Sequence, residues 1–232
     1  MSNTSRTHSE KVAEEFGHWA QIGKDQAMER GHGRFTEVAL AAWSLGADDH
    51  VLDVGCGNGW ALRRMIQRGA GSGVGVDISA EMVALATPPG RYLQANADTL
   101  PLPDACFSHI LSVEALYYAD APAAALREWS RVARPGAKLM VLVDLYRENP
   151  CHLIWCPLLP FPVQVLGQDE WAEAINASGW QTCTARRILD PRGPQPEAEF
   201  EPNPFAPTYG DYLAEKQAGT LCLEAVRGQP QN

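Results

Sequence analysis

Three glycines at alternate positions, Gly55, Gly57 and Gly59, constrain the fold of this chain more than any other feature. They directly follow a short apolar run, residues 50–54, which is typical of a buried strand. Residues 60–69 then carry apolar side chains at helical spacing. Glycine lets a chain turn sharply off a strand, and a helix N-terminus favours an anionic ligand. The pattern therefore predicts a strand, a ligand-binding turn and a helix.

The same alternation of strand and helix continues along the chain. The further strands that we expect cover residues 73–77, 91–95, 107–113, 138–144, 180–188 and 220–226. Strands that alternate with helices predict an α/β fold with an open, mostly parallel sheet, whose ligand crevice lies at the carboxyl ends of the strands. Asp53, Asp77, Glu114 and Asp144 all fall at or just past such ends.

The hydrophobic content favours one core over two. With 232 residues, of which 45% are hydrophobic, we expect a single domain over residues 1–232. Residues 1–35 are expected to form a helical lid, with an irregular stretch at 28–33 and a new helix capped by Thr36. The pattern loosens at 145–167 and 189–218, which we interpret as insertions near the acceptor pocket.

Charge and hydropathy exclude several classes of function. A net charge of -9 would repel phosphate backbones, so we expect no nucleic-acid partner. The N-terminal residues lack the apolar run of a signal peptide, and no stretch of about 18 apolar residues follows, which predicts a cytoplasmic protein without membrane insertion. The six cysteines form no Cys-x-x-Cys pair, and no metal site is predicted.

Two carboxylates narrow the ligand expected at the glycine turn. Asp77 ends the second strand 22 residues after Gly55, the separation at which an acidic side chain meets ribose hydroxyls. Asp98 follows the third strand, where a carboxylate can accept a hydrogen bond from an exocyclic amine. Nicotinamide-dependent oxidoreductases share the strand, turn and acid, but their glycine spacing is Gly-x-Gly-x-x-Gly, which argues against that alternative.

Five segments in order resemble the successive motifs of class I S-adenosylmethionine-dependent methyltransferases. These segments are residues 51–59, 75–79, 97–101, 107–113 and 133–137. Within that superfamily the chain is similar to the small-molecule branch that includes ubiquinone- and menaquinone-biosynthesis C-methyltransferases. The resemblance is strong over residues 36–144 and weak elsewhere.

The resemblance implies a Rossmann-like three-layer sandwich. Its seven-stranded sheet would have the order 3-2-1-4-5-7-6, with the last strand antiparallel. S-adenosyl-L-methionine would be the cofactor and S-adenosyl-L-homocysteine the product. Pro135-Gly136-Ala137 departs from the Pro-Gly-Gly of many relatives, and the Asn-Pro-Pro-Tyr signature of nucleobase amino methylation is absent after the fourth strand.

The same resemblance assigns cofactor contacts. Those implied for the methionine moiety are Asp53, Gly55, Gly57 and Gly59; for the ribose, Asp77; for the adenine, Ile78, Met82, Asp98 and Thr99; and beneath the sulfonium, Ser112 and Val113. Cys56 and Ala97 complete the cofactor residues that we expect.

Residues after the fourth strand are the candidates for contact with the methyl acceptor. Glu114 could orient an acceptor, and Tyr117 or Tyr118 could face the sulfonium, although packing at the start of a helix explains each equally well. Asp144 is a candidate base, cap or ion-pair partner. His32 could contact the cofactor's methionine carboxylate or the acceptor, but we expect a solvated loop histidine.

Two further segments bear on the acceptor and on assembly. Cys151 and Cys156 raise the alternative of a thiophilic acceptor such as trivalent arsenic. The apolar run 156–163 could line an acceptor pocket, pack on the core or bury itself in a homodimer.

The predicted function is methyl transfer from S-adenosylmethionine to a small molecule by in-line displacement. Such a displacement relies mainly on positioning, so a missing catalytic dyad does not argue against an enzyme. The alternative is a noncatalytic module of the same fold that binds S-adenosylmethionine or a partner. The sequence leaves open which atom of the acceptor, O, N, C, S or As, is methylated.

Overall fold

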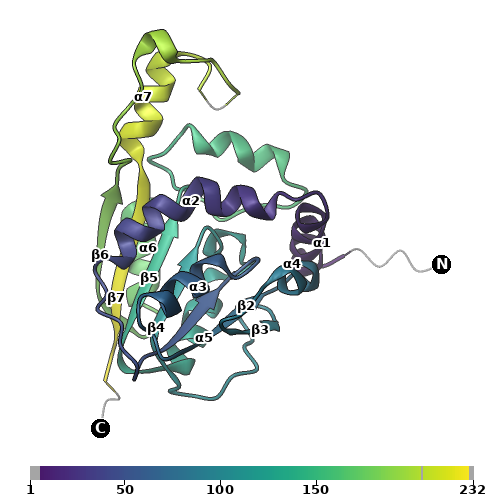
Figure 1. Ribbon diagram of the computed structural model, residues 1–232, viewed down its shortest axis with the longest axis vertical. Helices are drawn as coiled ribbons and strands as arrows, with labels where there is room; N and C mark the ends of the chain where they lie inside the picture. The colour runs from purple at the N-terminus through teal and green to yellow at the C-terminus, as the bar shows by residue number, and fades with distance from the viewer. Residues whose placement is uncertain (1–5, 205, 230–232) are drawn as a thin grey trace, which may run out of the picture.

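A seven-stranded sheet with the order β3-β2-β1-β4-β5-β7-β6 forms the centre of the computed structural model, which describes residues 6–204 and 206–229 (Figure 1). The strands are β1 (His50–Val54), β2 (Ser72–Asp77), β3 (Arg91–Gln94), β4 (Phe107–Val113), β5 (Ala133–Val143), β6 (Trp180–Ile188) and β7 (Thr220–Arg227). Strands β1 to β5 pair in parallel, whereas β7 runs antiparallel to both β5 and β6. The predicted fold class, strand order and antiparallel last strand are confirmed.

Helices cover both faces of this sheet. They are α1 (His8–Gln21), α2 (Asp25–Leu40), α3 (Trp60–Gln67), α4 (Ala80–Leu85), α5 (Pro122–Val132), α6 (Gln168–Asn176) and α7 (Tyr209–Ala218). One buried cluster joins the sheet to α2 and α3, through side chains such as Leu40 and Met65. A second cluster joins it to α5 and α6, through Trp129 and Trp171. Two cores on one sheet make the three-layer sandwich.

The central strands are apolar without alternation because both their faces are covered. In β1, Val51, Leu52 and Val54 are all buried. Asp53 is also buried there, and its carboxylate accepts a hydrogen bond from the backbone N–H of Leu62 in α3 at 3.1 Å. This bond fastens the start of the helix to the strand on the far side of the glycine turn.

The glycine turn has a left-handed backbone at each of its three glycines. Gly55, Gly57 and Gly59 have φ angles of 76°, 52° and 78°. A Cβ atom on Gly55 would lie 2.2 Å from the Cβ of Ala115, whereas one on Gly57 would meet no atom within 4 Å. Gly55 is therefore needed for packing as well as for conformation, and Gly57 borders open space.

The N-terminal segment differs from its prediction at residues 28–33, which are helical. Helix α2 runs without interruption through this stretch, and Thr36 lies inside it, donating its hydroxyl to the carbonyl of His32 at 2.9 Å. The Arg64 guanidinium in α3 pairs with Glu29 and Glu37 on this helix. These ion pairs and the packing of α2 on α3 offset the low helix propensity of its glycines.

The two expected insertions contain short helices. Residues 145–167 include a 3-10 helix at His152–Leu158. Residues 189–218 include a 3-10 helix at Glu197–Glu199 and then α7, which projects from the top of the view in Figure 1. Thr208 caps α7, and its hydroxyl accepts the N–H of Asp211 at 3.1 Å. Of the described helices, none combines the length and apolar character that crossing a bilayer requires.

The glycine turn yields a matched pair of substitutions. We expect Gly57→Ala to lower the free energy of unfolding by about 1 kcal/mol, the cost of a left-handed backbone at alanine. Gly55→Ala adds a clash with Ala115 to the same backbone cost, and we expect a loss of about 3 kcal/mol or more. Urea unfolding of both variants measures the difference, and equal losses would contradict the packing role of Gly55.

Candidate functional site

A cavity opens at the carboxyl ends of β1, β2 and β4, beneath helices α1 and α2. Its floor consists of the glycine turn and the residues that follow β2, β3 and β4. Its roof consists of side chains from the two N-terminal helices, among them Phe16 and His32. The crevice predicted for an open parallel sheet is therefore covered by α1 and α2.

The structure brings most of the predicted site residues to this cavity. Those that line it are Gly55, Cys56, Gly57, Asp77, Ile78, Met82, Ala97, Val113 and Glu114. The predicted residues that do not line it are Asp53, Gly59, Asp98, Thr99, Ser112 and Tyr117. Among the tyrosines after β4, Tyr118 lines the cavity in place of Tyr117.

Asp77 holds two walls of the cavity together. One carboxylate oxygen accepts the backbone N–H of Gly57 at 2.8 Å, and the other accepts the N–H of Ser79 at 2.9 Å. Ser79 in turn caps α4, its hydroxyl accepting the N–H of Met82 at 3.1 Å. Burial raises the pKa of Asp77, although these N–H donors oppose the shift. Each carboxylate oxygen keeps a second lone pair for a ligand.

The residues outside the cavity contact other parts of the protein. Burial raises the pKa of Asp53 to about 7, and the Leu62 N–H holds its carboxyl group away from the cavity. Gly59 forms the N-cap of α3. Asp98 accepts the hydroxyl of Thr99 at 3.0 Å at the protein surface. Ser112 is buried in β4.

Glu114 follows β4 and Asp77 ends β2, so the two residues line the cavity on either side of the glycine turn after β1. The Glu114 backbone has a φ of 53°, and its N–H donates to the carbonyl of Leu142 at 2.9 Å. One carboxylate oxygen, Oε2, accepts the hydroxyl of Tyr117 at 2.8 Å and the N–H of Asp144 at 3.0 Å. The other, Oε1, is buried and has no hydrogen-bond partner. Tyr117 thus positions Glu114 from outside the cavity.

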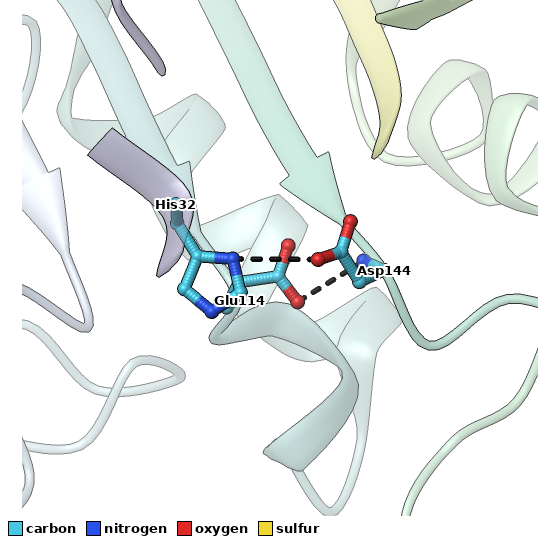
Figure 2. A group of neighbouring side chains, drawn as sticks. All are labelled: His32, Glu114 and Asp144. Carbon is cyan, nitrogen blue, oxygen red and sulfur yellow. Dashed lines mark hydrogen bonds and ion pairs between the residues drawn. The ribbon is translucent and has the colours of Figure 1, made fainter. Parts of the chain in front are cut away.

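His32 reaches the same place from the roof. Figure 2 shows its ring facing Asp144, with Nδ1 3.3 Å from Oδ2 of that carboxylate. The prediction of a solvated loop histidine is wrong, because α2 carries His32 into the cavity. Asp144, a candidate base, cap or ion-pair partner by sequence, is an ion-pair partner.

The three side chains determine one another's protonation. Burial lowers the pKa of His32, but its ion pair with Asp144 and the charge of Glu114 outweigh burial and raise it to about 9. Burial and the neighbouring Asp144 raise the pKa of Glu114 to about 7, against the opposing effects of His32 and its hydrogen-bond donors. Burial would raise the pKa of Asp144, but His32 and His152 hold it below its usual range.

The charged cluster extends away from the cavity toward α7. His152 Nδ1 lies 3.8 Å from Asp144 Oδ2, and its Nε2 lies 3.7 Å from Glu215 Oε1. Neither His152 nor Glu215 is predicted from the sequence as part of a site, because they come from separate elements with no common spacing. Cys151 donates its thiol to the carbonyl of Asp211 at 3.5 Å, and neither it nor Cys156 lines the cavity.

Comparison with known proteins identifies the family. Residues 52–141 match the methyltransferase domain family. The chain is 30% identical over 187 residues to the O-methyltransferase resE of Aspergillus sclerotiorum, covering 75% of this chain and 70% of that protein. It is 34% identical over 190 residues to a tRNA U34 carboxymethyltransferase of Saccharophagus degradans, covering 67% of this chain and 58% of that protein.

A solved structure matches nearly the whole chain. It is a methyltransferase in complex with the Haloferax volcanii Trm112 methyltransferase activator, 30% identical, with a TM-score of 0.87 over 93% of this chain and 98% of that one. Other curated O-methyltransferases are matched over 52% to 67% of their length, with 52% in a Penicillium expansum protein. The acceptors and partners in these names belong to those proteins. The chain itself is a class I methyltransferase that uses S-adenosyl-L-methionine as its cofactor.

Proposed function

We propose that this enzyme transfers the methyl group of S-adenosylmethionine to a small-molecule acceptor by in-line displacement. The observation that carries the proposal is one cavity that runs from the glycine turn and Asp77 to Glu114. A cofactor bound along the first part directs its methyl group toward the second. In the transfer, the bond from sulfur to methyl breaks while the bond from acceptor to methyl forms.

The cofactor lies along the floor of the cavity in this proposal. Its methionine end contacts Gly55, Cys56 and Gly57, and its ribose donates hydroxyls to Asp77. The adenine lies among Ile78, Met82 and Ala97, and Val113 passes beneath the sulfonium. Asp53 and Gly59 act indirectly, by fixing the turn on β1 and α3. Contacts from Asp98, Thr99 and Ser112 stay predictions.

Three observations favour a small acceptor. Helices α1 and α2 roof the cavity, so an acceptor must fit beneath them. The cavity lining includes aromatic side chains from both sides, with Phe16 in the roof and Tyr118 in the floor 4.9 Å apart at their ring centroids. The net charge of -9 opposes binding of RNA. A closer relation to quinone C-methyltransferases, a cytoplasmic location and a homodimer stay predictions.

The proposed function also assigns roles to the segments of the chain. Residues 1–232 act as one methyltransferase domain, and residues 1–35 act as its lid; of these, residues 1–5 lie outside the described part of the chain. Support comes from Val12, Phe16, Met28 and His32, which all face the cavity from α1 and α2. The segments 145–167 and 189–218 border the acceptor end through His152 and Glu215.

Methyl transfer can be tested before the acceptor is known. We expect the enzyme, given methyl-labelled S-adenosylmethionine and a protein-free metabolite extract, to place label in the small-molecule fraction. Total RNA from the same cells, offered in parallel, should stay unlabelled. Label in RNA alone would contradict the small acceptor, and no label in either fraction would favour the noncatalytic module.

Cofactor binding can be tested at Asp77. We expect Asp77→Ala to weaken the affinity for S-adenosylhomocysteine by about 10- to 100-fold, because two ribose hydrogen bonds and the anchor of Gly57 are lost. Calorimetry measures the affinity, and thermal melting checks that the variant folds. Asp98→Ala, at a side chain outside the cavity lining, should change the affinity much less. Wild-type enzyme that fails to bind at millimolar concentration would refute the proposed function.

A protein partner is also part of this proposal. We infer that an activator of the Trm112 type binds this chain, because the similar methyltransferase was solved with such a partner and matches 93% of the chain. We expect the two proteins to elute together in size-exclusion chromatography when co-expressed. Separate elution at micromolar concentration, with both proteins folded, would contradict the inference.

A further inference from the structure

In the buried carboxyl group of Glu114, one oxygen accepts two hydrogen bonds and the other accepts none. Tyr117 and the Asp144 N–H both donate to Oε2, which fixes the direction of the side chain. Oε1 has no hydrogen-bond partner, and the residue is only 8% exposed. A left-handed backbone, with φ of 53°, is needed to turn this residue into the cavity. A buried, unpaired acceptor is costly unless a ligand uses it.

Glu114 also lies next to the part of the cavity proposed for the methionine end of the cofactor. The next residue, Ala115, packs closely on the glycine turn. A Cβ atom added to Gly55 would lie 2.2 Å from the Cβ of Ala115. Glu114 and Val113 line the cavity together with Gly55. A positive charge on the sulfonium would therefore share a low-dielectric space with this carboxyl group, where charges interact strongly.

Within the cluster of His32, Glu114 and Asp144, Glu114 is the carboxyl group whose pKa lies near neutral pH, whereas the pKa of Asp144 is lowered. Glu114 is faced by His32 from α2, Asp144 after β5, the neighbouring Tyr117 and His152 from the 3-10 helix. His32 and Asp144 form an ion pair, in which the imidazolium already holds its proton at neutral pH. Because the pKa of Glu114 is raised to about 7, the carboxyl group is protonated in part of the molecules.

We propose that the sulfonium of bound S-adenosylmethionine ionises Glu114, and that the resulting carboxylate accepts the proton of an acceptor whose nucleophile is a hydroxyl group. This inference rests on the proposed function and names its class of acceptor. A hydroxyl must lose its proton during methylation. Oε1 is buried without a hydrogen-bond partner and belongs to a residue that lines the cavity, whereas Asp144, whose Oδ1 is also unpartnered, lies outside the lining. His32 cannot accept that proton while it is itself protonated. Its positive charge instead holds the carboxylates of Glu114 and Asp144 in place and offsets their negative charge.

The step balances in atoms and charge. The hydroxyl oxygen attacks the methyl carbon, the bond from carbon to sulfur breaks, and sulfur keeps the electron pair. The hydroxyl proton passes to Oε1 of Glu114. The products are the methyl ether, neutral S-adenosylhomocysteine and a neutral Glu114 carboxyl group. Because the positive charge has gone, the cavity again favours the protonated acid.

Proton release on cofactor binding tests the proposal without an acceptor. Calorimetry at pH 7 in buffers of different ionisation enthalpy counts the protons released by each ligand. We expect S-adenosylmethionine to release about half a proton more than S-adenosylhomocysteine, since a group with a pKa of about 7 is half protonated at pH 7. The ratio of the two affinities should rise about tenfold in favour of S-adenosylmethionine between pH 6 and pH 8.

Two isosteric variants serve as test and control. Glu114→Gln should abolish both the extra proton and the pH dependence of the ratio while sparing affinity for S-adenosylhomocysteine. Glu128→Gln should keep both, because Glu128 lies outside the cavity lining and its carboxylate pairs with Arg131. Equal proton release by the two ligands in the wild type, or a pH-dependent ratio that persists in Glu114→Gln, would overturn the proposal. If neither ligand binds the wild type, the proposed function falls and this inference with it.

Discussion

The carboxylate of Asp77 makes two hydrogen bonds on which the shape of the cavity depends. One secures the turn after β1 at Gly57, and the other secures the start of the segment after β2 at Ser79. Pairing of β1 with β2 in parallel brings both segments to the same edge of the sheet, but it does not set their separation. A single side chain at the end of β2 sets it, at the energetic cost of burying a carboxylate. The floor of the cavity, the cap of α4 and the path of the glycine turn all follow from that arrangement.

The strands of the sheet could be predicted because each strand and each turn has a recognisable pattern in its own short stretch of sequence. The apolar run of β1, the alternate glycines and the helix that follows lie within twenty residues, and their order is typical of one fold class. Helix α2 was not predicted in full, since Gly31 and Gly33 oppose a helix locally. The ion pairs of Arg64 with α2 come from a different part of the chain, and no spacing within residues 25–40 indicates them.

The site divides in the same way. The half proposed for the cofactor is built from segments that each follow a strand. Spacing and the resemblance to class I methyltransferases predicted Gly55, Gly57 and Asp77 as site residues, and all three line the cavity. Spacing does not show whether a side chain reaches the cavity. Asp53 and Asp98 follow the expected pattern but lie outside the cavity lining. The charged half joins α2, the ends of β4 and β5, a 3-10 helix and α7. Its members, His32, Glu114, Asp144, His152 and Glu215, meet only through tertiary structure.

The ion pair between His32 and Asp144 connects the roof of the cavity to the sheet. Any movement that lifts α2 from the cavity separates these two charges and leaves two buried carboxylates without their nearest cation. Water must then enter to solvate them, or a proton must be taken up. Access to the cavity and its charge state are consequently one equilibrium, and a ligand that changes either one shifts the other.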